Sequence, residues 1–161
     1  MDCKGLQTGD IIKYNGRLYG VEAVDAIYDT VSFFDREAEG YLDIRYDKIE
    51  PVELTAEILD KLPGFVRESV WSGLAEYSYT VEGHDDIEYD GLKFSTVVKL
   101  TVTVGDDGKV RSLKLKAFTE KGIFNDEIVK RPDSPYYLHE LQRMLSKADY
   151  GYDVRVSVGA D

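Results

Sequence analysis

The segment PYYLHELQRML (135–145) places a histidine beside a glutamate on a stretch with helical periodicity. His139 and Glu140 match the first half of H-E-x-x-H, a zinc-protease motif whose second histidine lies one turn later and shares the metal. Arg143 occupies that later position, and its positive charge would repel a metal ion. The sequence therefore predicts a solvated or capping role for His139, and neither a metal nor a cofactor.

The segment DIEYDG (86–91) resembles the first half of a calcium-binding loop, with acidic residues Asp86, Glu88 and Asp90 followed by a glycine. The position of the bidentate glutamate that closes such a loop is taken by Val97. A β-hairpin explains the same residues with fewer assumptions. Weak calcium binding stays open as the alternative.

His84 precedes two aspartates, and a histidine–aspartate pair can orient a general base. Catalysis would also need a nucleophile or further ligands, and the chain has only two histidines. The sequence contains neither a phosphate-binding glycine loop nor a nucleophile elbow. We predict that His84 lies in a surface loop and that the protein has no catalytic residue.

Asp90-Gly91 and Asp107-Gly108 each separate two segments of alternating apolar residues, a pattern typical of two-residue hairpin turns. Closing both turns predicts a three-stranded meander. The expected opposite pairs are Ile87 with Phe94, Tyr89 with Leu92, Glu88 with Lys93, Leu100 with Leu115, and Val102 with Leu113. The inward residues of the middle strand are then Phe94, Val98, Leu100, Val102 and Val104.

The same register sets Lys99 opposite Lys116 on the outer face, with Lys114 one row away beside Thr101. Extended backward, it places Glu82 on the other side of Lys99. Like charges that face each other across strands are destabilising. We therefore predict either a solvated strand face or a small contact for an anionic partner at Lys99, Lys114 and Lys116.

The chain contains twelve tyrosines, and five of them crowd the first fifty residues. Tyrosine is favoured at interfaces because it buries a large area at low entropy cost. We predict partner binding by Tyr14 and Tyr19, with core packing as the alternative. Tyr28, Tyr41 and Tyr46 lie in the same region.

The elements that must position these residues indicate an α+β fold. Short strands around Asn15-Gly16, TVSFF and YLDIRYDKIE predict an SH3-like small β-barrel over residues 1–53. Residues 54–161 are predicted to form the antiparallel meander. The expected later elements are a joint helix at 55–62 capped by Thr55, a packing helix at 135–148, and a strand at 152–158. Ser134 would cap the packing helix, whose apolar stripe is Leu138, Leu141, Leu145 and Ala148.

The composition of the 161-residue chain suits a packed domain, with 43% apolar residues and a net charge of −11. Acidity disfavours duplex nucleic acid, because phosphates are repelled. Cys3 is the only cysteine, and the start of the chain has no apolar signal core. We expect a cytoplasmic protein that does not bind a membrane.

Three segments carry a resemblance: LQTGDIIKYNGRLYGVEAV, IEPVELTAEILDKLPGF and YYLHELQRML. In this order they are similar to a family of small uncharacterised proteins of Bacteroides phages and integrated mobile elements. The last motif matches at Tyr137, His139, Leu141 and Gln142, while Glu140 stands where glutamine is usual. The resemblance implies a mobile-element origin and an accessory role, and it implies no activity.

These observations predict a non-enzymatic protein-binding module, with a bacterial host factor as one possible partner. The first alternative is a small-ligand or nucleotide-binding protein that uses a cleft between the two halves. An enzyme that depends on His84 and the acidic residues near it is the third and least favoured reading.

Overall fold

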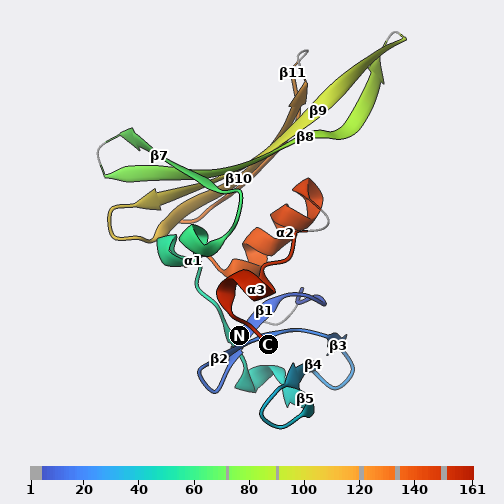
Figure 1. Cartoon of the computed structure of the whole chain (residues 1–161), viewed down its shortest axis with the longest axis vertical. Coiled ribbons are helices and arrows are strands. Elements are labelled where there is room, and N and C mark those ends of the chain that lie inside the picture. Colours follow the sequence, from blue (N-terminus) through green and yellow to red (C-terminus); the bar gives the residue numbers. More distant parts are fainter. Residues whose placement is uncertain (1–4, 72, 90, 120–121, 133–134, 150–151) are drawn as a thin grey trace. The chain divides into compact units, whose positions relative to one another are not determined.

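The computed structural model describes residues 5–71, 73–89, 91–119, 122–132, 135–149 and 152–161, without the side chains of 83–89, 92–94 and 124–125. These residues form antiparallel sheets with a few short helices, which confirms the α+β character (Figure 1). The chain divides into two compact units. Unit 1 comprises Met1–Glu53, Tyr137–Gln142 and Asp153–Asp161, and unit 2 comprises Leu54–Tyr136 and Arg143–Tyr152. Two short segments near the end of the sequence thus belong to the unit that the first 53 residues begin.

Unit 1 begins with a hairpin of β1 (Ile11–Tyr14) and β2 (Arg17–Gly20). Its turn residues, Asn15 and Gly16, have φ angles of 48° and 78°. Both angles are positive, as a type I′ turn requires, and asparagine and glycine tolerate them best. The predicted Asn-Gly hairpin is therefore confirmed.

The other strands of unit 1 are β3 (Ala23–Asp25), β4 (Thr30–Asp35), β5 (Gly40–Arg45) and β6 (Glu50–Pro51), with a 3₁₀ turn, η1 (Tyr46–Lys48). They form two three-stranded sheets, ordered β2–β1–β6 and β3–β4–β5. Val21 donates its N–H to Asp10 O, and Glu22 donates to Ser32 O, so the chain changes sheet at these two residues. Among the described residues no closed barrel is found, in contrast to the predicted SH3-like barrel.

The inner faces of both sheets contribute to one apolar core in unit 1. Val31 and Phe33 alternate with outward residues along β4 and are fully buried. Period-two alternation explains this, because successive side chains point to opposite faces of a strand. The buried members of the core are Leu6, Ile12, Tyr19, Val21, Val31, Phe33 and Ile49.

Unit 2 contains a five-stranded sheet ordered β11–β10–β9–β8–β7. The strands are β7 (Val66–Trp71), β8 (Leu74–Tyr89), β9 (Leu92–Gly105), β10 (Val110–Thr119) and β11 (Gly122–Lys130). The predicted meander is its centre, β8–β9–β10, whereas the two outer strands, β7 and β11, were not predicted. Val98, Leu100, Val102 and Val104 are buried as predicted, whereas the side chain of Phe94 lies outside the described residues.

The predicted pairing is confirmed between β9 and β10 and, next to Gly91, between β8 and β9. Opposite pairs include Ile87 with Phe94, Glu88 with Lys93, Leu100 with Leu115, and Val102 with Leu113. The second turn differs from the prediction, because Gly105 N donates to Lys109 O at 2.9 Å and the turn encloses three residues. A bulge between Val110 and Ser112 then restores the predicted pairing.

Helix α1 (Ala56–Lys61) confirms the predicted joint helix, and the Thr55 hydroxyl caps it by accepting the Ile58 N–H at 3.4 Å. Helix α2 (Leu138–Ala148) begins three residues later than predicted. Tyr137 precedes it, and the Tyr137 N–H donates to Glu140 Oε1 at 3.1 Å, as in one half of a capping box. The proposed cap Ser134 lies outside the described residues.

The apolar stripe of α2 is confirmed, since Leu138, Leu141, Leu145 and Ala148 are at most 2% exposed. Within α2, residues 138–142 belong to unit 1 and residues 143–148 belong to unit 2. In unit 2, α1 and the C-terminal half of α2 lie on one face of the five-stranded sheet (Figure 1).

The strand predicted at 152–158 is wrong, because these residues contain a one-turn helix, α3 (Arg155–Val158). The Asp153 carboxylate accepts the Arg155 N–H at 2.9 Å and so favours a turn at this point. Gly159, with φ of 71°, ends the helix in the left-handed conformation. The alternation of valines in YDVRVSV therefore does not reflect a strand.

Candidate functional site

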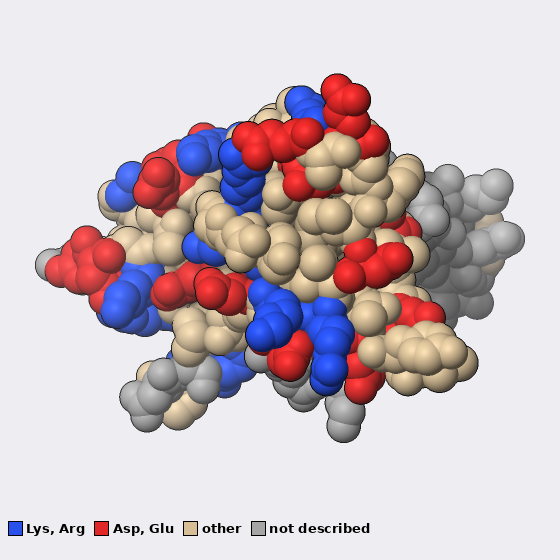
Figure 2. Space-filling view, turned by 90° about the horizontal axis from the view of Figure 1, so that it is seen from below, with Lys and Arg blue, Asp and Glu red and all other residues tan. Residues whose placement is uncertain are grey.

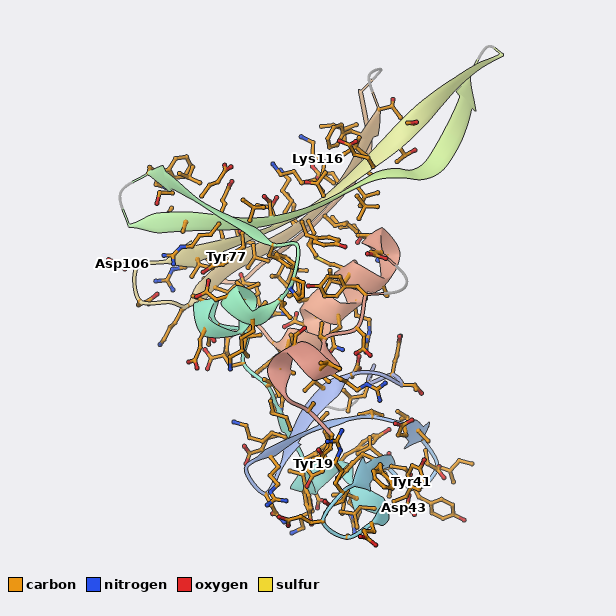
Figure 3. The ribbon with its side chains drawn as sticks, viewed as in Figure 1. Tyr19, Tyr41, Asp43, Tyr77, Asp106 and Lys116 are labelled. Carbon is orange, nitrogen blue, oxygen red and sulfur yellow. The ribbon has the colours of Figure 1, made fainter. Side chains whose placement is uncertain are left out.

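The outer face of the β3–β4–β5 sheet exposes two aromatic side chains. Phe34 on β4 lies directly opposite Tyr41 on β5, and their ring centroids are 5.4 Å apart in an edge-to-face arrangement. Phe34 is 37% exposed and Tyr41 is 68% exposed. Because Phe33 points into the core, the next residue must point out. We call Phe34 and Tyr41 the aromatic row; Figure 3 shows Tyr41 pointing away from the sheet.

The turn between β3 and β4 presents two more large apolar side chains. Ile27 is 87% exposed and Tyr28 is 74% exposed. The Asp25 carboxylate oxygen Oδ1 accepts the N–H of Ile27 at 2.9 Å and that of Tyr28 at 3.2 Å. The Asp25 side chain therefore stabilises the turn, which presents Ile27 and Tyr28 to solvent.

A groove of about 540 Å³ lies along the same face. Part of it follows the row Ala23–Ser32–Asp43, which crosses the three strands next to the aromatic row. Alanine and serine have small side chains, so the surface of the sheet is recessed along this row between the larger side chains on either side. We call this the outer groove; its lining residues are Ala23, Val24, Asp25, Ala26, Ile27, Tyr28, Thr30, Ser32 and Asp43.

The charge of the outer groove is negative. Asp25 and Asp43 are its two charged lining residues, and its lining includes neither lysine nor arginine. The Ser32 hydroxyl donates to Asp43 Oδ1. Among the described residues, no ion pair within 4.0 Å includes either aspartate. The arrangement can therefore accept a cationic group beside the exposed ring of Tyr28.

The structure places the two tyrosines predicted to bind a partner against the core of unit 1. Tyr19 is 3% exposed, with its ring centroid 4.4 Å from that of Phe33. Burial raises the pKa of its hydroxyl. Tyr14 is half-buried and packs on the same phenylalanine at 5.7 Å. The exposed tyrosines of this region are instead Tyr28 and Tyr41.

Sequence reasoning missed Ile27, Phe34 and Asp43 as parts of this surface. A signal for Phe34 was present in TVSFF, whose alternation sends Val31 and Phe33 inward and Phe34 outward. No comparable local signal marks Asp43, because the groove depends on three strands lying side by side.

The three predicted lysines lie on adjacent rows of β9 and β10. Lys99 is opposite Lys116, and Lys114 is opposite Thr101, as predicted. Figure 3 shows Lys116 on the sheet face that points away from the helices of unit 2. The Lys116 ammonium also lies 5.7 Å from the ring centroid of Phe118.

The predicted position of Glu82 beside Lys99 is wrong. Thr80 lies opposite Lys99, because the register shifts between Glu82 and Asp86, where β8 has more residues than β9. On the other side, Asp126 of β11 lies opposite Lys116. The row therefore reads Thr80–Lys99–Lys116–Asp126, and one aspartate offsets part of the positive charge.

His139 lies at the start of α2, half-buried, with its ring stacked on Tyr137 at 5.6 Å and 8° between the planes. The side chains of His84, Asp86, Glu88 and Asp90 lie outside the described residues. The backbone of His84 belongs to β8, so the predicted surface loop is wrong at this residue. Calcium binding by the acidic residues stays a prediction.

Comparison of the chain with protein-family models, with curated proteins and with solved structures finds no match.

Proposed function

We propose that this protein is a non-enzymatic protein-binding module that engages its partner through the outer face of the β3–β4–β5 sheet. The observation that carries this proposal is the exposure of Ile27, Tyr28, Phe34 and Tyr41 on one turn and one sheet face. Large apolar groups exposed together commonly mark interaction sites, and tyrosine is enriched at binding hot spots.

The wider setting belongs to the same proposal. We propose a cytoplasmic accessory protein of a phage or mobile element, whose first 53 residues act as an SH3-like binding unit and whose partner is a bacterial host factor. The support is the resemblance of three sequence segments. Among the described residues, none of the helices has both the length and the apolar character needed to cross a membrane.

The test is capture of proteins from a bacterial lysate by the wild-type chain and by a Tyr28→Ala/Tyr41→Ala double variant. Both side chains are exposed, so the double variant should keep the wild-type melting temperature within a few degrees. A matched control is Ile128→Ala, which removes an exposed side chain from the other unit. We expect a partner that wild type and control retain and that the double variant loses.

Equal capture of every protein by all three chains would contradict the proposal. If the double variant does lose a partner, titration calorimetry with that purified partner would measure the loss of binding free energy directly. A binding hot spot costs about 2 kcal/mol or more on truncation to alanine.

A second candidate function is binding of a small ligand or nucleotide. The outer groove favours it, since its volume of about 540 Å³ lies within the range of roughly 300–1,000 Å³ typical of ligand pockets. A thermal-shift screen with metabolites tests this candidate, because a ligand that binds only the native state raises the midpoint. A compound that stabilises wild type but not a Ser32→Trp variant would favour ligand binding in the groove.

A further inference from the structure

We propose that the outer groove receives a lysine or arginine side chain from an extended segment of the partner, with apolar residues flanking that cation. The inference rests on the proposed function, because it specifies the chemistry of the partner at the same surface. Asp43 would pair with the cation, and the ring of Tyr28 would lie beside it.

The shape of the sheet face supports a single inserted side chain. The row Ala23–Ser32–Asp43 lies two residues along the strands from the aromatic row, a spacing of about 7 Å. On the other side of this row, the turn with Ile27 and Tyr28 also lines the groove. A long, thin side chain fits such a space, and its neighbours in the segment can pack on the apolar groups at either side.

The hydrogen bonding of Asp43 leaves it able to bind a cation. The Ser32 hydroxyl donates to Oδ1 and orients the carboxylate. The neighbouring row contains one basic residue, Arg45, which lies opposite Thr30 and pairs with Asp47 at 3.7 Å. A guanidinium or ammonium from the partner can therefore form a charge-assisted hydrogen bond with Oδ2.

Tyr28 adds a second means of recognition. Tyr28 is 74% exposed, and the hydrogen bonds that Ile27 and Tyr28 donate to Asp25 hold the backbone of the turn. A cation within about 6 Å of an aromatic centroid is attracted by the ring face. Asp25 contributes a further negative charge at the same end of the groove.

The charge of the whole chain argues for a basic partner segment rather than a second copy of this chain. The net charge is −11, so two copies repel each other before they meet. The same charge attracts a basic segment and raises the rate of its association.

The experiment is a selection from a library of displayed random twelve-residue peptides, with the full chain as bait at low salt. Selected peptides are then synthesised and titrated by fluorescence anisotropy. We expect lysine or arginine at one fixed position, between apolar residues. Asp43→Asn should weaken binding about tenfold or more, as loss of a charged hydrogen bond predicts.

Glu50→Gln is the matched control, because it removes an equal charge from an exposed residue of unit 1 that does not line the groove. It should change the affinity less than about twofold, since an exposed charge outside the contact contributes little. Tyr28→Ala should weaken binding as well. Circular dichroism and melting temperature would establish that each variant is folded.

Two results separate the inference from the proposed function. If the peptides carry no basic position, or Asp43→Asn binds them as wild type does, the inference is overturned. In that case the proposed function still stands if the Tyr28→Ala/Tyr41→Ala variant no longer binds the selected peptides. If that double variant also binds as wild type does, or if no peptide is enriched, the inference fails, and lysate capture alone decides the proposed function.

Discussion

At the scale of single residues, two tyrosines of β8 connect the sheet of unit 2 to the segments that cover it. The Tyr77 hydroxyl donates to Asp60 of α1, and the Tyr79 hydroxyl donates to Asp149 just after α2, each at 2.6 Å. Tyr77 and Tyr79 are two residues apart on a strand, so both point to the same face. Figure 3 shows Tyr77 on the face toward the helices.

Both bonds raise the pKa of the tyrosines. Burial and then the bond to Asp60 raise the pKa of Tyr77 to about 12, and the bond to Asp149 together with burial raises that of Tyr79 to about 12. The unfolded value is about 10, so the folded state favours the protonated hydroxyl. This contribution to stability is fully present below pH 10 and is lost as the pH rises toward 12.

We therefore predict that the free energy of unfolding falls between about pH 10 and pH 12, the window that the unfolded and folded pKa values define. Urea denaturation at pH 8, 10 and 11 would measure the fall. A Tyr77→Phe/Tyr79→Phe variant should be less stable at pH 8 and should lose less stability on going to pH 11. An identical pH dependence in both proteins would contradict the prediction.

At the scale of elements, the lysine row tests how strand register sets surface electrostatics. Lys116 lies between Lys99 and Asp126, so one neighbour repels it and the other attracts it. In Lys116→Glu the signs of both pairs reverse, and we expect the stability to change by less than about 0.5 kcal/mol.

Asp126→Lys is the informative partner of that variant, because it places three lysines side by side. It should destabilise by some tenths of a kcal/mol, and Lys116→Glu should restore the loss in the double variant. Urea denaturation at low salt measures all four proteins. Additive effects of the two substitutions would show that the side chains do not interact.

Helix α2 is a second element with a direct test. Leu145 is 2% exposed and belongs to the buried stripe, whereas its neighbour Ser146 is exposed. Leu145→Ala should lower the free energy of unfolding by about 2–5 kcal/mol, because it removes transfer energy and leaves a cavity. Ser146→Ala is the matched control and should change it by less than about 0.5 kcal/mol. Equal effects would contradict the assignment of the buried face.

At the scale of the whole molecule, charge decides which macromolecules can approach. With a net charge of −11, the chain repels the phosphate backbone. On the face that Figure 2 shows, lysine and arginine form separate groups among acidic and uncharged side chains rather than a continuous stripe.

We predict that the protein does not bind duplex DNA with sub-micromolar affinity at about 150 mM salt. A gel shift with a random-sequence duplex would measure this. The Lys114→Glu/Lys116→Glu variant is the control, since weak binding at low salt should disappear if it comes from the lysine row. A shifted band at nanomolar protein and physiological salt would contradict the prediction.

The sequence by itself determined the features that neighbouring residues control. The Asn15-Gly16 hairpin follows from two residues that accept positive φ. Strand register around Gly91 follows from the turn and the alternation beside it, and the buried stripe of α2 follows from helical periodicity. These patterns act over a few residues, so they can be read without knowing the fold.

Only the tertiary structure decided which surface is presented to a partner. Tyr19 and Tyr41 both occur in short strands of the first fifty residues. Tyr19 packs against Phe33 in the core, whereas Tyr41 is exposed on the outer face of the β3–β4–β5 sheet. The shift in β8 replaced Glu82 with Thr80 beside Lys99. Residues 153–161 join unit 1 through the Asp161 backbone, which pairs with Leu18 and Gly20. The outer groove depends on three strands, so its position is fixed by pairing between distant segments, which local pattern does not encode.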